Sequence, residues 1–394
     1  MRTTYSILIC LLPLLSHAQD GYQMKGNADE TTADFLSSYY HQDGDNAAVT
    51  GGIGTEKLTD VANLFVVNVP IDSVQAIDFT AGADNYSSAS TDNINSIVSS
   101  ASSRDTRVYA HLGYTRKNLK KGQTYGARIG FSREFDYTSF NFGFSWAKEW
   151  NEGNSELSLN AQAFIDRWRL IFPAEIRSRV RGTISSPNRQ SFNFQATYSQ
   201  VINRRLQMSV SGETVYMNGL LSTPFHRVYF ADQTRPDIER LPNSRLKIPL
   251  GLRVNYFPFD NFVMRSYYRF YWDDFGIVAH TASIETPVKL GSSFTVSPFY
   301  RYHTQTAADY FAPFSAHLST EEFYTSDHDL SGLDSHKIGI GIKYAPLYGI
   351  GRAKISSGKK LLKFESVHMR GAYYKRSTGL HSFVVSLDLA FKIK

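Results

Sequence analysis

Hydrophobic and polar side chains alternate along the last stretch of the chain, from His381 to Lys394. Apolar residues occupy every second position, namely Phe383, Val385, Leu387, Leu389, Phe391 and Ile393. The intervening positions are mostly polar: Val384, Ser386, Asp388, Ala390, Lys392 and Lys394. Because successive side chains of a strand point to opposite faces, this period of two predicts an amphipathic β-strand. Such a final strand is typical of bacterial outer-membrane barrels, and an edge strand of a soluble β-protein is the alternative.

The same alternation recurs through the chain. Strands are predicted at 34–42, 57–70, 74–84, 105–117, 123–135, 138–150, 156–165, 191–202, 206–218, 245–257, 262–273, 276–287, 292–304, 336–345, 362–374 and 381–394. In 138–150, Phe140, Phe142, Phe144 and Trp146 alternate with small or polar residues. Most of these segments have about the length that crosses a bilayer at a tilt. The pattern predicts sixteen strands, with fourteen as the alternative count.

The connections between these strands differ in length in a regular way. Short ones lie at 70–73, 118–122, 151–155, 203–205, 258–261 and 289–292, and long ones at 85–104, 166–190, 219–244 and 305–335. Long and short connections alternate along the chain, so the long ones all lie at the same end of the predicted barrel. The long segment 345–361 is the exception, because it lies at the end with the short connections. We therefore predict an all-β, transmembrane, antiparallel up-and-down barrel with short periplasmic turns, long external loops and periplasmic termini.

The first eighteen residues resemble a secretory signal. Arg2 precedes an apolar core at 7–15, and Ser16-His17-Ala18 offers small residues for cleavage after Ala18. The expected organisation is a signal peptide at 1–18, a flexible lead at 19–33 and an outer-membrane barrel at 34–394. Cleavage would remove Cys10, the chain's one cysteine, so the mature protein could form no disulfide. The net charge of +6 is spread over many segments, and nucleic acid is not expected as a partner.

Several motifs resemble an uncharacterised, domain-of-unknown-function family of Gram-negative outer-membrane β-barrel proteins of roughly 400 residues. The most specific is the stretch 39–56, YYHQDGDNAAVTGGIGTE, and weaker similarities occur at 87–92, 221–229, 323–330 and 373–377. The resemblance implies a barrel over nearly the whole mature chain. It also implies a role beside small lipoproteins, thioredoxin-like proteins and flavin-transferase proteins, in envelope redox chemistry or maturation. It supplies no catalytic residues.

Acidic residues at the external ends of the predicted strands are candidate ligands for a cation. The candidate set is Asp43, Asp45, Asn46, Asp327 and Asp329. Flexible loops with several oxygen ligands suit calcium. The full EF-hand pattern is absent, however, and turn formation alone accounts for Asp-Gly-Asp-Asn.

Four histidines share this external parity: His41, His226, His328 and His336. Together with the nearby aspartates they suggest a transition-metal site. Their spacing shows no metal-binding motif, and a solvated loop residue is the alternative for His328.

Four arginines are predicted to face the lumen. If Leu252, Val254 and Tyr256 face lipid, alternation turns Arg253 inward, and the same argument applies to Arg265, Arg269 and Arg301. Charged rings set the selectivity of pores, so this wall could favour anions. Alternatively, these arginines pair with carboxylates such as Asp273 and Glu285 and fill the lumen.

The loop 166–190 is rich in arginine beside Trp168 and Phe172. Its arginines are Arg167, Arg169, Arg177, Arg179, Arg181 and Arg189. Arginine binds phosphates well, which suggests lipopolysaccharide as a partner, and a solvated basic loop is the alternative.

No nucleophile, zinc-hydrolase or nucleotide-binding motif occurs in a usable context, so no enzyme activity is expected. The leading functional hypothesis is a porin-like channel or a transport or assembly component for small solutes in the outer membrane. A non-conducting anchor or partner-binding platform is the second hypothesis, and a rim-sited hydrolase the third. Expected partners are membrane lipids, the barrel-assembly machinery, and envelope lipoproteins or redox proteins.

Overall fold

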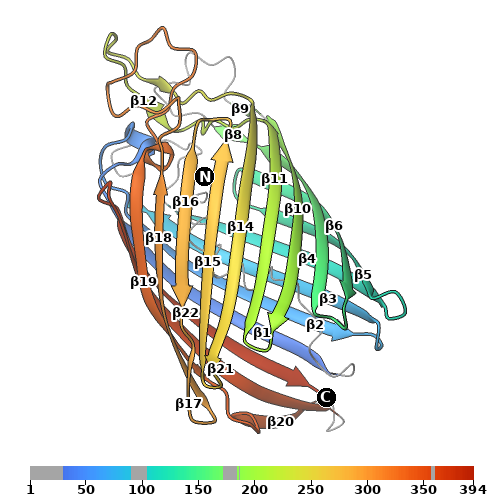
Figure 1. Ribbon diagram of the computed structural model, residues 1–394. Helices are drawn as coiled ribbons and strands as arrows, with labels where there is room; N and C mark the ends of the chain where they lie inside the picture. Colours follow the sequence, from blue (N-terminus) through green and yellow to red (C-terminus); the bar gives the residue numbers. More distant parts are fainter. Residues whose placement is uncertain (1–29, 90–103, 172–183, 186, 356–359) are drawn as a thin grey trace.

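The fold is a closed antiparallel β-barrel (Figure 1). The computed structural model describes residues 30–89, 104–171, 184–185, 187–355 and 360–394. The long strands of the wall are β1 Thr31–Asp43, β2 Leu58–Pro70, β3 Gln75–Ser88, β4 Arg104–Asn118, β5 Gln123–Arg133, β6 Tyr137–Trp150, β7 Ser155–Trp168, β10 Asn188–Asn203, β11 Leu206–Gly219, β14 Ser244–Phe259, β15 Phe262–Asp273, β16 Val278–Glu285, β18 Phe294–Gln305, β19 Leu333–Tyr344, β21 Lys360–Arg376 and β22 His381–Ile393. Two short segments, β17 Val288–Leu290 and β20 Gly351–Ile355, extend this sheet.

The first and last strands close the ring. β1 pairs with β22 from Thr31↔Ile393 to Asp43↔His381, and every other wall strand pairs with its neighbours in chain order. β17 continues the wall strand of β16, because both pair between β15 and β18. The wall therefore has sixteen strands, which confirms the predicted count and fold class.

The two faces of the wall differ in chemistry because side chains alternate across each strand. In β6, Phe140 and Phe144 on the outer face are 51% and 70% exposed, whereas Ser139 and Asn141 on the inner face are buried. A barrel with an apolar outer face and a polar inner face has the construction of membrane-spanning barrels. Among the described residues, no helix is long and apolar enough to cross a bilayer.

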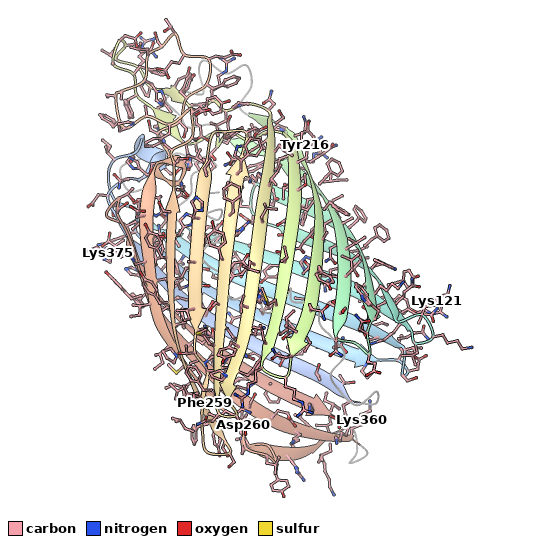
Figure 2. All side chains as sticks on the ribbon, viewed as in Figure 1. Lys121, Tyr216, Phe259, Asp260, Lys360 and Lys375 are labelled. Carbon is pink, nitrogen blue, oxygen red and sulfur yellow. The ribbon has the colours of Figure 1, made fainter. Side chains whose placement is uncertain are left out.

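Short turns join the strands at one end of the barrel, where β1 also begins at Thr31 and β22 ends at Ile393. Lys121, Asp260 and Lys360 mark this end in Figure 2. The segment 345–361 was the exception to the predicted loop lengths, and β20 explains it. β20 pairs with the start of β21, from Gly351↔Phe364 to Ile355↔Lys360, so this connection is an extended hairpin that remains at the short-turn end.

Among the described residues, three long loops gather at the opposite end of the barrel, where β12 and neighbouring loop segments lie above β16–β19 in Figure 1. They are 44–57 between β1 and β2, 220–243 between β11 and β14, and 306–332 between β18 and β19. The second contains the hairpin of β12 Arg227–Val228 and β13 Asp237–Ile238. We call these three loops the loop cap. Another minor hairpin pairs β8 Leu170–Ile171 with β9 Ile184–Ser185.

Hydrophobic side chains hold the loop cap together. Val49 packs with Phe225 and with Trp168 from the end of β7, and Val228 and Phe230 pack with Tyr324. The loops 220–243 and 306–332 also exchange backbone hydrogen bonds between Arg240 and Tyr324, at 3.0 and 2.7 Å. The cap therefore has a small core of its own, built from segments far apart in the sequence.

Candidate functional site

The inner face of the wall is the first candidate site. Residues paired across neighbouring strands share a face, so the register Ser211–Gly251–Arg269–Thr281–His303–Ser335 traces one inner row. Arg253 pairs with Ser209 and Tyr267, and Arg265 pairs with Asn255 and Glu285. Arg301 pairs with Ser283 and Lys337. The structure thus places all four candidate arginines on the inner face.

Carboxylates and aromatic rings accompany these arginines. Arg265 Nη1 lies 3.4 Å from Glu285 Oε1, and Arg370 Nη2 donates to Glu285 Oε2 at 3.0 Å. Arg245 forms an ion pair with the fully buried Asp273. The guanidinium groups of Arg253 and Arg269 lie 5.6 and 5.9 Å from the ring centroids of Tyr267 and Tyr271. Part of the basic wall is therefore neutralised locally, while the Arg265 side chain keeps 47% of its surface accessible.

Two sectors of the inner face differ in charge, and further inward basic residues such as Arg301 lie between them on β18 and β19. The basic sector is β14 and β15, with inward Arg245, Lys247, Arg253, Arg265 and Arg269 beside Asp273. The acidic sector is β22, β1, β2 and β3, with inward Asp388, Asp34, Asp60, Asp78 and Asp84 and with Lys392 near the short-turn end. Two of these carboxylates are paired with arginines of the adjoining wall, Asp84 with Arg107 at 2.6 Å and Asp78 with Arg128 at 3.1 Å. Alternation along single strands could predict the inward arginines, but only the order of strands in the closed ring shows that these two sectors are separate.

The two sectors lie on opposite walls. From β3 to β14 the ring passes through β4–β7, β10 and β11, and from β15 back to β22 it passes through β16, β18, β19 and β21. Figure 1 accordingly draws β14 and β15 in front and β2 and β3, fainter, behind them. A charged solute between these walls would be attracted by one and repelled by the other.

The candidate calcium ligands have separate partners in the structure. Asp43 lies 3.6 Å from Lys57 and accepts a hydrogen bond from the amide of Gly44. Asp45 is exposed, and Asn46 Nδ2 donates to the carbonyl of Thr378 at 2.7 Å. Calcium binding at Asp43, Asp45 and Asn46 with Asp327 and Asp329 stays a prediction.

A second candidate site lies inside the loop cap. His226 Nδ1 is 3.6 Å from Glu239 Oε1 and 3.7 Å from Asp327 Oδ2, and one ligand atom from each residue lies within 4.8 Å of the others. His226 and Glu239 are buried, and Asp327 is half-buried. The β12–β13 hairpin brings the first two together, since the amide of Glu239 donates to the carbonyl of His226 at 2.9 Å. Sequence reasoning missed Glu239 because this pairing depends on a hairpin without a hydrophobic period.

The other three candidate histidines lie elsewhere. His41 Nδ1 is 2.9 Å from Thr59 Oγ1, and His336 Nδ1 is 2.6 Å from the hydroxyl of Tyr300. The register places both on the outer face, next to the apolar positions. The His328 ring packs edge-on against Phe311, with centroids 5.2 Å apart. Only His226 of the four joins a carboxylate cluster among the described residues.

Burial shapes the electrostatics of the cap. Burial and the charge of Asp329 raise the pKa of Asp327, although His226 opposes the shift. Burial lowers the pKa of His226, but Glu239, Asp327 and Asp329 outweigh it, so the net pKa is raised. Burial and the charge of Asp329 raise the pKa of Glu56 to about 7, against the opposing charge of Arg376. Arg376 binds Asp329, with Nη1 2.6 Å from Oδ1, and so partly neutralises the cap from the end of β21.

The arginine-rich segment 166–190 divides between wall and loop. Arg189 binds Asp166 through Nη2 at 2.7 Å, and its guanidinium lies 5.6 Å from the centroid of Trp168. Both charges are buried, so Arg189 belongs to the upper wall. Arg177, Arg179, Arg181 and Phe172 lie outside the described residues. Lipopolysaccharide binding by this segment stays a prediction.

The closed sixteen-strand wall, with its apolar outer face and charged inner face, defines an outer-membrane-type β-barrel. Within this class, the family model described as "Protein of unknown function (DUF3570)" matches residues 10–377. The chain belongs to this uncharacterised family, as the motif resemblance predicted. No curated protein matches the sequence.

The solved structures that this chain matches have very different sequences. A bacterial polysaccharide outer membrane secretin is 9% identical, with a TM-score of 0.45, and the match covers 93% of this chain and 99% of the secretin chain. A ferric enterobactin receptor (PfeA) from Pseudomonas aeruginosa is 12% identical, with a TM-score of 0.45, and the match covers 87% of this chain. The siderophore receptor PirA from Acinetobacter baumannii is 12% identical, with a TM-score of 0.44 and 87% coverage of this chain. The matched region spans 53% of each of these two receptor chains, so this chain corresponds to about half of either.

Proposed function

We propose that the protein is an outer-membrane channel for small polar solutes, with short periplasmic turns and an external loop cap. The observation that carries this proposal is the closed wall of sixteen strands with charged inner sectors. Barrels of eight strands can be filled by their own side chains, whereas barrels of sixteen to eighteen strands leave room for an aqueous channel. The apolar outer face suits the bilayer, and a polar interior suits water.

The two oppositely charged sectors should determine which solutes pass through this channel. A transverse field favours solutes that carry separated positive and negative groups, because such solutes can align between the two walls. Anions would pass along β14 and β15, and cations along β22 and β1–β3. The channel therefore selects small dipolar or charged solutes over apolar ones.

Single-channel conductance across a salt gradient tests both claims. Purified full-length protein in a planar bilayer should give stable conductance steps. Arg269→Gln should lower the ratio of anion to cation permeability, and Asp34→Asn should raise it. The expected change is roughly twofold to fivefold, because one charge about 4 Å away contributes about 1 kcal/mol in water. Arg205→Gln, in the short turn between β10 and β11, is the matched control and should leave the ratio unchanged.

A silent bilayer from protein that is folded, as judged by heat-modifiable migration, would contradict the channel. A second function, a partner-binding platform, would then lead. The observation that favours a platform is the loop cap, which has its own hydrophobic core and inter-loop hydrogen bonds. The redox or maturation role implied by the family resemblance fits either function. If cleavage after Ala18 removes Cys10, the chain's one cysteine, thiol chemistry in such a system would belong to a partner.

A further inference from the structure

The cluster of His226, Glu239 and Asp327 has the form of a metal site. We propose that it binds one divalent transition-metal ion, with Zn²⁺ as the best fit, and that this ion fastens the loops 220–243 and 306–332 to each other. The inference does not depend on conduction, because the cluster lies in the loop cap and the charged sectors lie in the wall.

Each of the three residues has a ligand atom within 4.8 Å of those of the other two. His226 is 7% exposed, and its Nδ1 has no hydrogen-bond partner. This atom faces Glu239 Oε1 and Asp327 Oδ2 at 3.6 and 3.7 Å. Buried polar atoms in proteins are nearly always satisfied, so an unpartnered imidazole nitrogen between two carboxylates indicates a missing ligand.

The surroundings fix both carboxylates for this role. Glu239 Oε2 accepts the amide of Thr223 at 2.5 Å, and Oε1 accepts the hydroxyl of Thr325 at 2.6 Å. A carboxylate oxygen has two lone pairs, so Oε1 can still bind a metal. Asp327 Oδ1 accepts the amide of Asp329 at 2.9 Å, which leaves Oδ2 for the metal. Such outer contacts orient ligands in metal sites.

The separations suit ligands of a shared metal ion. Ligands about 2.0–2.2 Å from a common zinc ion lie about 3.3–3.6 Å apart in a tetrahedron. The two distances from His226 Nδ1 are close to this range and too long for hydrogen bonds. One imidazole nitrogen with two carboxylate oxygens suits zinc, whereas magnesium and calcium prefer oxygen ligands alone.

The charges of the cluster also favour a cation. Glu239 and Asp327 are two carboxylates in a largely buried site, and Arg376 is already bound to the neighbouring Asp329. A divalent ion would compensate both charges and leave His226 neutral, which is its ligating form. It would also join residues of two loops more than eighty positions apart in the sequence.

Zinc binding by the full-length protein tests the site. Protein folded in detergent, stripped with EDTA and dialysed against Zn²⁺ should retain one zinc per chain by elemental analysis. His226→Gln and Asp327→Asn should each weaken zinc binding by at least about tenfold, a loss that even outer partners of a ligand can cause. Zinc should also protect the loop 220–243 of the wild type from protease.

Matched variants separate this site from other ligands. His336→Gln replaces an outward-facing histidine, and Asp237→Asn replaces a cap carboxylate outside the cluster, so both should bind zinc as the wild type does. Heat-modifiable migration of every variant shows that the barrel is folded. Equal zinc retention by the wild type and His226→Gln, or binding of calcium in preference to zinc, would overturn the proposal.

Discussion

The barrel wall and the loop cap differ in where their polar side chains find partners. In the wall, polar residues sit beside partners on neighbouring strands, such as Arg107 with Asp84. In the cap, the partners come from distant loops, such as Arg227, whose Nη1 donates to the carbonyl of Val49 at 2.7 Å. The wall is thus specified by local alternation and the cap by long-range contacts.

Because the two regions depend on different contacts, substitutions in one region should leave the structure of the other intact. Successive wall residues face lipid and lumen in turn, so the position of a residue along its strand determines the face on which an added charge lies. A cap position depends on loops that meet only after the ring has closed. We therefore expect wall variants to affect insertion and stability, and cap variants to affect loop accessibility and metal binding.

The largest expected effect tests the two faces of the wall. Phe144→Arg places a cation on the outer face of β6, where Phe144 is 70% exposed. At the bilayer midplane such a change costs about 2–4 kcal/mol of stability. The control is Ser145→Arg, the next residue, which points inward and is accessible. Urea unfolding in lipid vesicles should show the loss for Phe144→Arg and little for Ser145→Arg, and equal losses would contradict the assigned faces.

The second-largest expected effect is a pH dependence of stability that arises at Glu134, where a strand of the wall ends in a turn. Glu134, in the turn between β5 and β6, is 7% exposed and accepts the hydroxyl of Tyr86 at 3.0 Å. Burial raises its pKa to about 7, against the opposing charge of Arg107. The folded state therefore keeps a proton that the unfolded state releases above about pH 4.5. This contribution to stability is complete below pH 4.5 and is lost as the pH rises through 7.

Glu134→Gln isolates this contribution, because glutamine resembles the protonated carboxyl. Between pH 4.5 and 8 the free energy of unfolding of the wild type should fall by up to about 3 kcal/mol more than that of Glu134→Gln. Glu152→Gln, in the exposed turn between β6 and β7, should follow the wild type. Parallel pH profiles for wild type and Glu134→Gln would show that the carboxyl is not buried as the structure places it.

The wall could be predicted from the sequence because its signal is local. Phe140, Phe142 and Phe144 alternate with polar residues, and lipid on one face requires that period wherever the strand begins. The structure of the connection 345–361 could not be predicted from this local signal, because β20 is too short and too exposed to show an alternating pattern. A longer turn and a miscounted hairpin were the two alternatives, and the structure has β20 paired only with β21, so the wall keeps sixteen strands.

The candidate sites were only partly predictable. Alternation was enough to turn Arg253 inward, but the acidic sector opposite needs the circular order of strands, which no single segment contains. His226 and Asp327 were recognisable as ligand types, whereas Glu239 joins them through the β12–β13 hairpin. Long-range packing determines which residues meet in such a cluster, and the spacing of residues along the chain does not reveal these contacts.

The smallest expected effect tests whether the loop 44–57 contacts the loop 306–332. Gly51 and Gly52 have φ angles of 85° and 88°, and an added Cβ at Gly52 would lie 2.6 Å from the carbonyl oxygen of Ser326. Gly52→Ala therefore combines a left-handed backbone cost of about 1–2 kcal/mol with a steric conflict against the loop 306–332. Gly153→Ala is the control, because Gly153 has a φ of 82° and no atom within 4 Å of its added Cβ.

The pair separates docking from backbone strain. Both variants carry the left-handed cost, so any additional effect of Gly52→Ala comes from contact between the loops 44–57 and 306–332. Limited proteolysis of protein in lipid vesicles should cut these loops several times faster in Gly52→Ala than in Gly153→Ala or the wild type. Equal rates would mean that the loops do not meet at Ser326, and the cap would then consist of 220–243 and 306–332 alone. Such a result would leave the zinc site intact, because its three residues belong to those two loops.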